Sequence, residues 1–313
     1  MSATTSTTAA FPAGAGPLPD VPGVEITHEF HDLPAGRFHV ARAGDPSKPA
    51  IMLVHGFPQH WWCWHGVVQE LAADAHLVMP DLRGYGWSAV PSGRSAYTKG
   101  ELANDLGLLL DAMGIEQIAV VGHDWGAWVS QLLALRRPEL VSRLLLLSMA
   151  PVIQGPRPPA RTLLRMWYQV AFAAPGSAAV ISRDPGLIGR GIRQDVQRPE
   201  AFTSADAHAY AELYRDPARA KAAQHCYRSF LLGDAAKTFA ATKGQRFAMP
   251  VRFVLSAHDA YVPPGFAAGA ERLGAQVEAF VQDRTGHFLP DEDPGYTAEQ
   301  VREFVIPHAA PLS

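Results

Sequence analysis

The stretch that decides the fold is Val120-Val121-Gly122-His123-Asp124-Trp125-Gly126-Ala127. It follows a short apolar run that is typical of a buried strand, and it opens a stretch with helical periodicity. Glycines stand two positions on either side of Asp124, and they allow a sharp turn from strand to helix that exposes the side chain at its apex. We predict that Asp124 is a nucleophile. The alternative, an aspartate that caps the following helix, is disfavoured by the residues described below.

Outward from this stretch, strand and helix signals alternate along the chain. Half-buried strands are predicted at 24–33 and 37–43, and short apolar runs typical of covered strands recur at 51–54, 77–79, 118–121, 144–147, 251–255 and 277–281. Helices are expected near 61–72, 98–113, 126–136, 264–273 and 296–306. This alternation predicts an α/β fold with a mostly parallel central sheet and helices on both faces.

The alternation fails between Pro151 and about Gln245, where we find several helical segments and no convincing strand. We therefore expect a helical cap, or lid, at 151–245, inserted between two parts of the core at 24–150 and 246–313. Residues 1–23 are rich in Thr, Ala, Gly and Pro and lack the basic start and apolar centre of a secretory signal. We expect them to form a disordered tail.

Composition argues against several classes of protein. The chain has 313 residues, with 27 Lys and Arg against 30 Asp and Glu, so the net charge of −3 gives no case for binding nucleic acid or an anionic membrane. No apolar run approaches the roughly 20 residues that span a bilayer. The two cysteines, Cys63 and Cys226, exclude a disulfide scaffold and a Cys-rich metal site, although they leave a single disulfide open. They fit a reducing compartment, and we expect a cytoplasmic protein.

An aspartate at the apex, where Gly-x-Ser-x-Gly sequences carry a serine, selects the chemistry. A carboxylate with a reference pKa of about 3.9 is ionised at neutral pH without help from a base. Its attack on an acyl carbon would give an anhydride, whereas its attack on an sp3 carbon with a leaving group gives a stable alkyl ester. Esterase, lipase and peptidase functions are therefore disfavoured, and epoxide opening and carbon–halogen cleavage remain.

Such an ester must then be hydrolysed at the carbonyl of Asp124, which requires a base to activate water and an acid to orient that base. Asp259 follows the predicted strand at 251–255, and His287 follows the last predicted strand. We assign Asp259 as the acid and His287 as the base. The segment 148–150, the other place where an acid could stand, has no carboxylate.

Negative charge that develops on the ester oxygen needs backbone N–H donors. We assign the N–H groups of Phe57, in the loop after the third strand, and of Trp125, at the start of a helix. The side chains of Phe57, Trp125 and Trp167 are also expected to contact substrate. For Trp61, Trp62 and Trp64 we expect packing in the core, with an aromatic wall for an apolar substrate as the alternative.

Three motifs resemble the epoxide hydrolase branch of the α/β-hydrolase family over roughly residues 24–306. They are His55–Pro58, Pro80–Ser88 and Gly122–Gly126, and the dehalogenases share them. The resemblance implies two cap tyrosines that hold the epoxide oxygen: Tyr168, in the segment 167–176, and Tyr227, which precedes Arg228. The sequence departs from the family pattern in 288–294, which is more acidic than expected. Tyr210 and Tyr214 are expected to be packing residues.

Two kinds of dehalogenase differ from this chain in specific positions. Haloalkane dehalogenases of similar pattern carry an Asn where this chain has Phe57, and fluoroacetate dehalogenases carry arginines in the region where it has Trp125 and Trp128. We predict an epoxide hydrolase that forms a vicinal diol through an Asp124 ester. The alternatives are a hydrolytic dehalogenase and a non-catalytic binding protein. The resemblance implies no metal and no organic cofactor, with a small apolar epoxide and water as partners, and it leaves a homodimer open.

Overall fold

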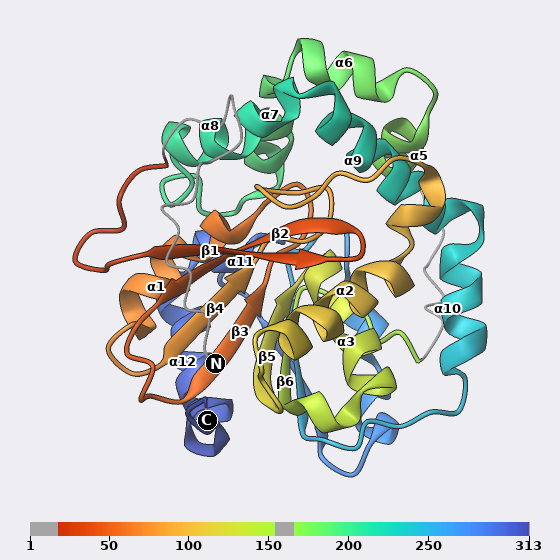
Figure 1. Ribbon diagram of the computed structural model, residues 1–313. Coiled ribbons are helices and arrows are strands. Elements are labelled where there is room, and N and C mark those ends of the chain that lie inside the picture. Colours follow the sequence, from red (N-terminus) through yellow and green to blue (C-terminus); the bar gives the residue numbers. More distant parts are fainter. Residues whose placement is uncertain (1–17, 154–165, 313) are drawn as a thin grey trace.

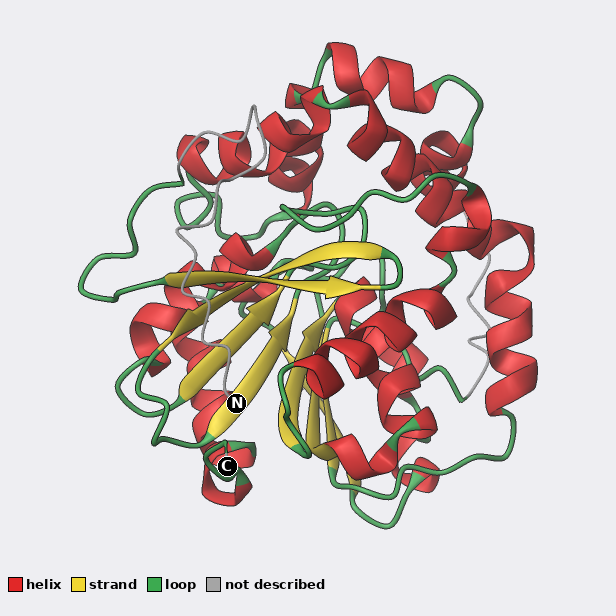
Figure 2. Ribbon diagram, in the orientation of Figure 1, coloured by secondary structure: helices red, strands yellow, loops and turns green. Residues whose placement is uncertain are grey.

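The computed structural model describes residues 18–153 and 166–312. Its strands form one sheet in the order β1-β2-β4-β3-β5-β6-β7-β8 (Figures 1 and 2). The first two strands pair antiparallel and β2 pairs antiparallel with β4, while every other pair is parallel. The predicted α/β fold with a mostly parallel sheet is confirmed. The strands are Thr27–Leu33 (β1), Gly36–Ala43 (β2), Ala50–Val54 (β3), His76–Pro80 (β4), Ile118–His123 (β5), Val141–Leu147 (β6), Val251–Ser256 (β7) and Val277–Gln282 (β8).

Helices cover both faces of the sheet. On one side α1 (His65–Leu71) packs against α12 (Pro294–Phe304), and on the other α2 (Lys99–Ala112) packs against α3 (Trp125–Arg136) (Figure 1). The central strands β3, β4 and β5 are buried along their whole length, as their continuous apolar sequences require. Parallel strands place their carboxyl ends at one edge, so the loops after β3, β5 and β7 meet there.

The helix predicted at 264–273 is wrong. The structure has two short 3-10 helices instead, η6 (Pro264–Ala267) and η7 (Ala270–Leu273). Gly269 separates them in the left-handed conformation, with φ 83°, which ends one helical turn before the next begins. The other 3-10 helices of the described residues are η1 (Trp61–Trp64), η2 (Arg94–Tyr97), η3 (Pro138–Leu140), η4 (Leu213–Arg215) and η8 (Ile306–His308).

A run of helices connects β6 to β7. They are α5 (Trp167–Ala173), α6 (Ser177–Arg183), α7 (Gly186–Asp195), α8 (Ser204–Glu212), α9 (Pro217–Ser229) and, after the π-helical turn η5 (Phe230–Asp234), α10 (Ala235–Thr242). Figure 1 shows α5 to α9 above one edge of the sheet, whereas α10 lies beside the core. We call α5 to α9, with their connections, the cap. They fall within the segment predicted as a lid, of which 154–165 lies outside the described residues.

The end of the predicted N-terminal tail differs from expectation. Val21 is buried in the core, and the backbone oxygen of Pro22 accepts a hydrogen bond from Gln69. They are ordered because Val21 joins the hydrophobic core and Pro22 is bonded to a residue of α1. Residues 1–17 of that prediction lie outside the described part. Across 18–153 and 166–312, the helices are all too short or too polar to span a bilayer.

Candidate active site

Asp124 lies at the turn between β5 and α3, with φ 49° and ψ −124°. Two glycines make this turn sterically accessible. A Cβ at Gly122 would lie 2.6 Å from the Cα of Ala127, and one at Gly126 would lie 2.2 Å from the backbone oxygen of Val54. The Asp124 side chain makes no capping hydrogen bond to α3. The turn therefore presents the carboxylate to the space above the sheet. The alternative, in which the Asp124 side chain caps the following helix, is wrong.

The three residues predicted as nucleophile, base and acid come together at the carboxyl edge of the sheet. The Nε2 atom of His287 lies 3.4 Å from Oδ2 of Asp124, and its Nδ1 lies 2.8 Å from Oδ2 of Asp259. The other oxygen of Asp259 accepts from the backbone N–H groups of Tyr261 and Val262, at 2.7 and 2.8 Å. These bonds fix the acid, which in turn fixes one ring nitrogen of the histidine and aims the other at Asp124.

The carboxylate of Asp124 and the imidazole of His287 favour opposite charges in each other. Burial by itself would raise the pKa of Asp124, but the hydrogen bond and charge of His287 hold that pKa below its usual value. Burial would likewise lower the pKa of His287, but the charge of Asp259 and the hydrogen bonds to both carboxylates raise it well above its usual value. Both shifts favour an ionised carboxylate at Asp124 beside a protonated imidazole at His287.

Backbone donors surround the Asp124 carboxylate where they were predicted. The N–H of Phe57 donates to Oδ1 at 2.7 Å, and the N–H of Trp125 contributes to the low pKa of the carboxyl group. A Cβ at Gly56 would lie 2.4 Å from the Cβ of Asp124, so the loop after β3 approaches closely only because residue 56 is glycine. Oδ1 therefore occupies a donor-lined position, and Oδ2 is the oxygen that faces His287.

A cavity of about 750 Å³ opens above Asp124, between the core loops and the cap. Its walls are mainly apolar, and Asp124 and His287 lie among them. The aromatic residues of the wall are Phe57, Trp167, Tyr168, Phe172, Tyr227, Tyr261 and Phe288. A pocket that is largely apolar, with a few convergent polar groups, is typical of a small-molecule site.

Both predicted tyrosines belong to this wall. Tyr168 comes from α5 and Tyr227 from α9, and their ring centroids lie 6.1 Å apart. Burial raises the pKa of both phenols, so each keeps its proton at neutral pH and can donate it. Neither hydroxyl donates a hydrogen bond within the described residues, although that of Tyr168 accepts one from Gln169 at 3.3 Å.

The other two cap tyrosines use their hydroxyls elsewhere. Tyr210 donates to the carboxylate of Asp291 at 2.7 Å, and Tyr214 donates to the backbone oxygen of Pro58 at 3.0 Å. Both residues are buried, and neither lines the cavity above Asp124. The structure therefore places them as packing residues.

Trp125 was predicted to contact substrate with its side chain, but its indole is absent from the wall of the cavity. The ring packs against Phe230 and against Tyr227, whose ring centroid lies 5.9 Å away, and the ammonium group of Lys99 lies 4.1 Å from it. The helix begins at Trp125, so its backbone N–H points to the site while its side chain turns into the core. Trp61, Trp62 and Trp64 are also buried and absent from the cavity wall, so the aromatic-wall alternative is wrong for them.

Sequence reasoning missed two residues of this region. Tyr261 lines the cavity and packs edge-on against both His287 and Tyr168, with ring centroids 5.1 and 4.8 Å apart. Its position two residues after Asp259 could have signalled it. Asp195, at the end of α7, is buried near His287 and Asp259, and burial raises its pKa to about 7. Nothing in the sequence near residue 195 indicates this placement.

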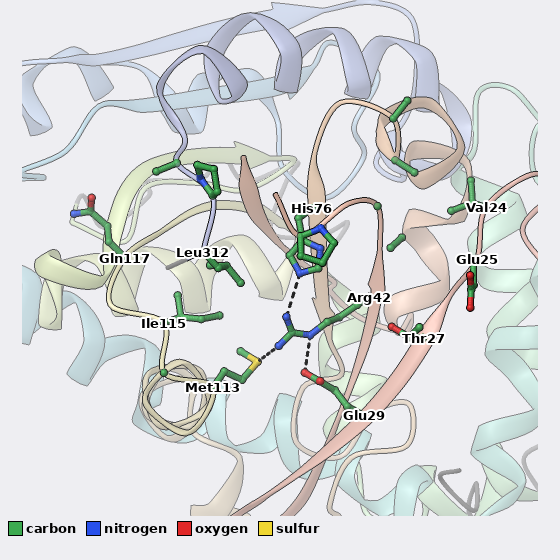
Figure 3. A pocket seen from close by; sticks show the side chains of 18 of the residues that line it. Val24, Glu25, Thr27, Glu29, Arg42, His76, Met113, Ile115, Gln117 and Leu312 are labelled. Carbon is green, nitrogen blue, oxygen red and sulfur yellow. Dashed lines mark hydrogen bonds and ion pairs between the residues drawn. The ribbon is translucent and has the colours of Figure 1, made fainter. Parts of the chain in front are cut away.

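A larger hollow, of about 1170 Å³, lies elsewhere and contains none of the predicted site residues (Figure 3). It opens beside the start of β4 and the end of β2. Three polar side chains of its wall already bond to one another, since Arg42 donates to Glu29 at 2.7 Å and lies 3.1 Å from His76. The cavity above Asp124 is smaller, but it is the one that holds the reactive groups.

The chain belongs to the alpha/beta hydrolase fold family, whose model matches residues 49–294. It is 28% identical over 292 residues to the soluble epoxide hydrolase of Corynebacterium sp. (strain C12), a match that covers 90% of this chain and 98% of that one. It is also 28% identical over 275 residues to the AB hydrolase superfamily protein YfhM of Bacillus subtilis (strain 168), covering 85% and 93% of the two chains. Among solved structures, the epoxide hydrolase CorEH without ligand superposes with a TM-score of 0.80 at 27% identity, covering 90% of this chain and 99% of that chain. The resemblance to epoxide hydrolases that the motifs indicated is confirmed.

Proposed function

We propose that the protein hydrolyses a small apolar epoxide to a vicinal diol through a covalent ester on Asp124. One observation carries the proposal: an ionised carboxylate, held by the Phe57 N–H and His287, shares a single apolar cavity with the protonated phenols of Tyr168 and Tyr227. A nucleophile for carbon and donors for oxygen are the two requirements for opening an epoxide.

In the first step, Oδ2 of Asp124 attacks an epoxide carbon, because Oδ1 is already committed to the Phe57 N–H. The carbon–oxygen bond of the ring breaks as the ester bond forms. The leaving oxygen accepts hydrogen bonds from Tyr168 and Tyr227 and takes up a proton there. The apolar cavity strengthens these bonds, since few other polar groups compete for the developing charge.

Ester formation changes the state of His287. The negative charge of Asp124 supports the high pKa of the imidazole, and the ester carries no such charge. The pKa of His287 therefore falls, and the imidazole can lose its proton, which restores the phenol that gave one up. It then accepts a proton from water, which attacks the ester carbonyl.

The oxyanion of that second step forms on Oδ1, where the N–H groups of Phe57 and Trp125 can stabilise it. Collapse of this intermediate breaks the bond between the carbonyl carbon of Asp124 and Oδ2, the oxygen that now carries the substrate. His287 gives its proton to Oδ2, and the diol leaves with that oxygen. The new carboxyl group keeps the oxygen of water and passes its remaining proton to His287, which restores the resting site. Asp259 stabilises the imidazolium in both steps, through its contact with Nδ1.

A hydrolytic dehalogenase with the same triad is not favoured. A halide leaving group needs no proton, so two protonated phenols over the nucleophile would have no part in its departure. Trp125 and Trp128, both buried, occupy the region where fluoroacetate dehalogenases carry arginines. Among the described residues of the cavity wall, Arg190 is an arginine, but its side chain is largely exposed and paired with Asp184. The similar proteins of Corynebacterium sp. (strain C12) and Siraitia grosvenorii are named as epoxide hydrolases.

A panel of substrates tests the proposal. The wild-type protein should convert terminal aryl or alkyl epoxides to diols and release little or no halide from 1-halobutanes or haloacetates. Asp124→Ala serves as the control and should be inactive on every member of the panel. Halide release with inert epoxides would reject the proposed function and favour the dehalogenase.

A further inference from the structure

The unexpectedly acidic segment after His287 is buried rather than solvated. Asp291 and Glu292 end the short helix α11 (Leu289–Glu292), and Asp293 follows it. Their exposed fractions are 6%, 0% and 6%. Buried carboxylates are costly unless hydrogen bonds compensate them, so the partners of these three groups show what the segment does.

Each of the three carboxylates bonds to the cap. Asp291 accepts from the hydroxyl of Tyr210 in α8, and Asp293 pairs with the Arg198 side chain at 3.1 Å. Glu292 accepts from the backbone N–H groups of Gln197 and Arg198, at 2.6 and 3.2 Å. Gln197 and Arg198 lie in the connection between α7 and α8, so the acidic segment holds one particular stretch of the cap.

Glu292 differs from its neighbours because it also holds the histidine loop. Its carboxylate accepts from the N–H of Gly286, at 3.0 Å to each oxygen, and from the N–H of Phe288 at 3.2 Å. These two donors flank His287 directly. One buried carboxylate thus bonds to the backbone on both sides of the proposed base and to two successive residues of the cap.

The cap and the histidine loop are also in direct contact. A Cβ at Gly286 would lie 2.4 Å from the backbone oxygen of Asp195, which ends α7, so no larger residue fits there without displacing the cap. On the core side, the His287 carbonyl oxygen accepts from Nε2 of His123 at 2.8 Å. The position of the imidazole therefore depends on bonds from the core and from the cap.

We propose that Glu292 is a positioning residue that couples the α7–α8 connection of the cap to His287, and so sets the geometry for ester hydrolysis. The inference rests on the proposed function, because it assigns Glu292 to the second of its two steps. Alkylation of Asp124 depends on the carboxylate and on the two tyrosines, none of which contacts Glu292. Hydrolysis depends on the placement of the imidazole, and a displacement of about 1 Å can slow such a step about a hundredfold.

Glu292→Gln tests the coupling, because it keeps the shape of the side chain but turns one acceptor into a donor that faces backbone N–H groups. In single-turnover experiments with a terminal epoxide, alkylation should stay within about threefold of wild type. Ester hydrolysis should slow about tenfold or more, so that the covalent adduct accumulates in the intact-protein mass spectrum. Glu292→Asp keeps the charge and should recover part of the hydrolysis rate.

The matched control is Asp291→Asn, which alters a buried carboxylate of the same segment that bonds to the cap but not to residues 286–288. Its ratio of hydrolysis to alkylation should equal that of wild type. A purely stabilising role for the segment would instead lower the melting temperatures of both variants and leave this ratio unchanged in each.

The outcomes separate the two proposals. If wild type forms no diol and His287→Gln forms no adduct, the proposed function fails, whatever Glu292 does. If wild type is active and folded Glu292→Gln hydrolyses the ester at the wild-type rate, the positioning role is overturned. If neither Glu292→Gln nor Glu292→Asp folds, Glu292 is a stabilising residue of the core and the positioning role is rejected.

Discussion

At the scale of single residues, the proposed reaction depends on where charge and protons rest before substrate enters. The hydrogen bond and charge of His287 lower the pKa of Asp124 against the effect of burial, and the charge of Asp259, followed by the contact with Asp124, raises the pKa of His287. Tyr168 and Tyr227 stay protonated because burial penalises the phenolate form. The epoxide oxygen is the acceptor that the two phenols lack in the resting site.

The tyrosines give a prediction for the first step. Tyr168→Phe or Tyr227→Phe removes one of two donors to the same oxygen and should slow alkylation about ten- to a hundredfold, the usual cost of a hydrogen bond to a charged group. The double variant should lose much more, because the alkoxide would then form without a donor. Pre-steady-state kinetics separates alkylation from ester hydrolysis, which should change little in all three variants.

Tyr214→Phe is the control for these variants, because its hydroxyl is bonded to Pro58 and lies outside the cavity wall. It should alkylate at the wild-type rate. If the double variant of Tyr168 and Tyr227 also opens the epoxide at the wild-type rate, the donors have been assigned to the wrong residues.

At the scale of secondary-structure elements, the geometry of the nucleophile depends on how closely α3 approaches β3 and β5. Gly126 sits at the start of α3, against the backbone oxygens of Val54 and His55. Those atoms belong to the end of a central strand and its loop, so they cannot move aside as a flexible side chain could. The helix α3 can therefore approach β3 this closely only because residue 126 has a hydrogen atom where any other residue has a Cβ atom.

Gly126→Ala tests this packing. The added methyl group would lie 2.2 and 2.4 Å from two backbone oxygens, and it should lower the free energy of unfolding by about 1–3 kcal/mol, as overpacking does. Gly107→Ala in α2 is the matched control, because its nearest neighbours lie 3.6 Å away and alanine favours the helix by up to about 1 kcal/mol. Urea unfolding of both variants measures the contrast. Equal stability of the two variants would contradict the account of the turn.

The sequence was informative where a candidate site residue lies at or shortly after the carboxyl end of a strand. Asp124 comes directly after β5, and Asp259 and His287 lie in the loops that follow β7 and β8, so the order of elements alone predicts that they meet. The direction of the Trp125 side chain could not be predicted, because it depends on how Phe230 and Lys99 pack from distant segments. Asp195 could not be predicted for the same reason, since its neighbours are more than 60 residues away in the chain.

At the scale of the whole molecule, the proposed active site lies between two parts of the chain, and the proposed first step draws on both. The core supplies Asp124, Asp259 and His287, and the cap supplies the two tyrosines. The interface between cap and core also buries Asp195, which faces the charged groups of His287, Asp259 and Glu292. Tyr261 also lies beside it, and burial, followed by the charge of Asp195, raises the pKa of that phenol.

Asp195 makes stability depend on pH. Burial raises its pKa from 3.8 to about 7, with added repulsion from Asp259 and Glu292 that the charge of His287 opposes. The folded state therefore holds a proton that the unfolded state releases above about pH 4, so this group's contribution to stability falls as pH rises towards 7 and is constant beyond. Each pH unit between the two pKa values lowers the free energy of unfolding by about 1.4 kcal/mol.

Asp195→Asn removes this penalty. Relative to wild type, the variant should gain more free energy of unfolding at pH 8 than at pH 5, with a difference of about 2.6 kcal/mol. Asp184→Asn, at an exposed carboxylate just before α7, should give no such difference. Urea titrations at the two pH values measure both, and an equal gain at pH 5 and pH 8 would show that Asp195 is already ionised in the folded protein.

The central claim is that substrate passes through a covalent ester on Asp124, and intact-protein mass spectrometry tests it most directly. His287→Gln leaves the nucleophile and the tyrosines in place but removes the base. After mixing with an epoxide that wild type converts to diol, this variant should carry an adduct of the full epoxide mass, located on the peptide that contains Asp124. Asp124→Ala should carry none. An active wild type whose His287→Gln variant stays unmodified throughout the reaction would contradict the two-step account.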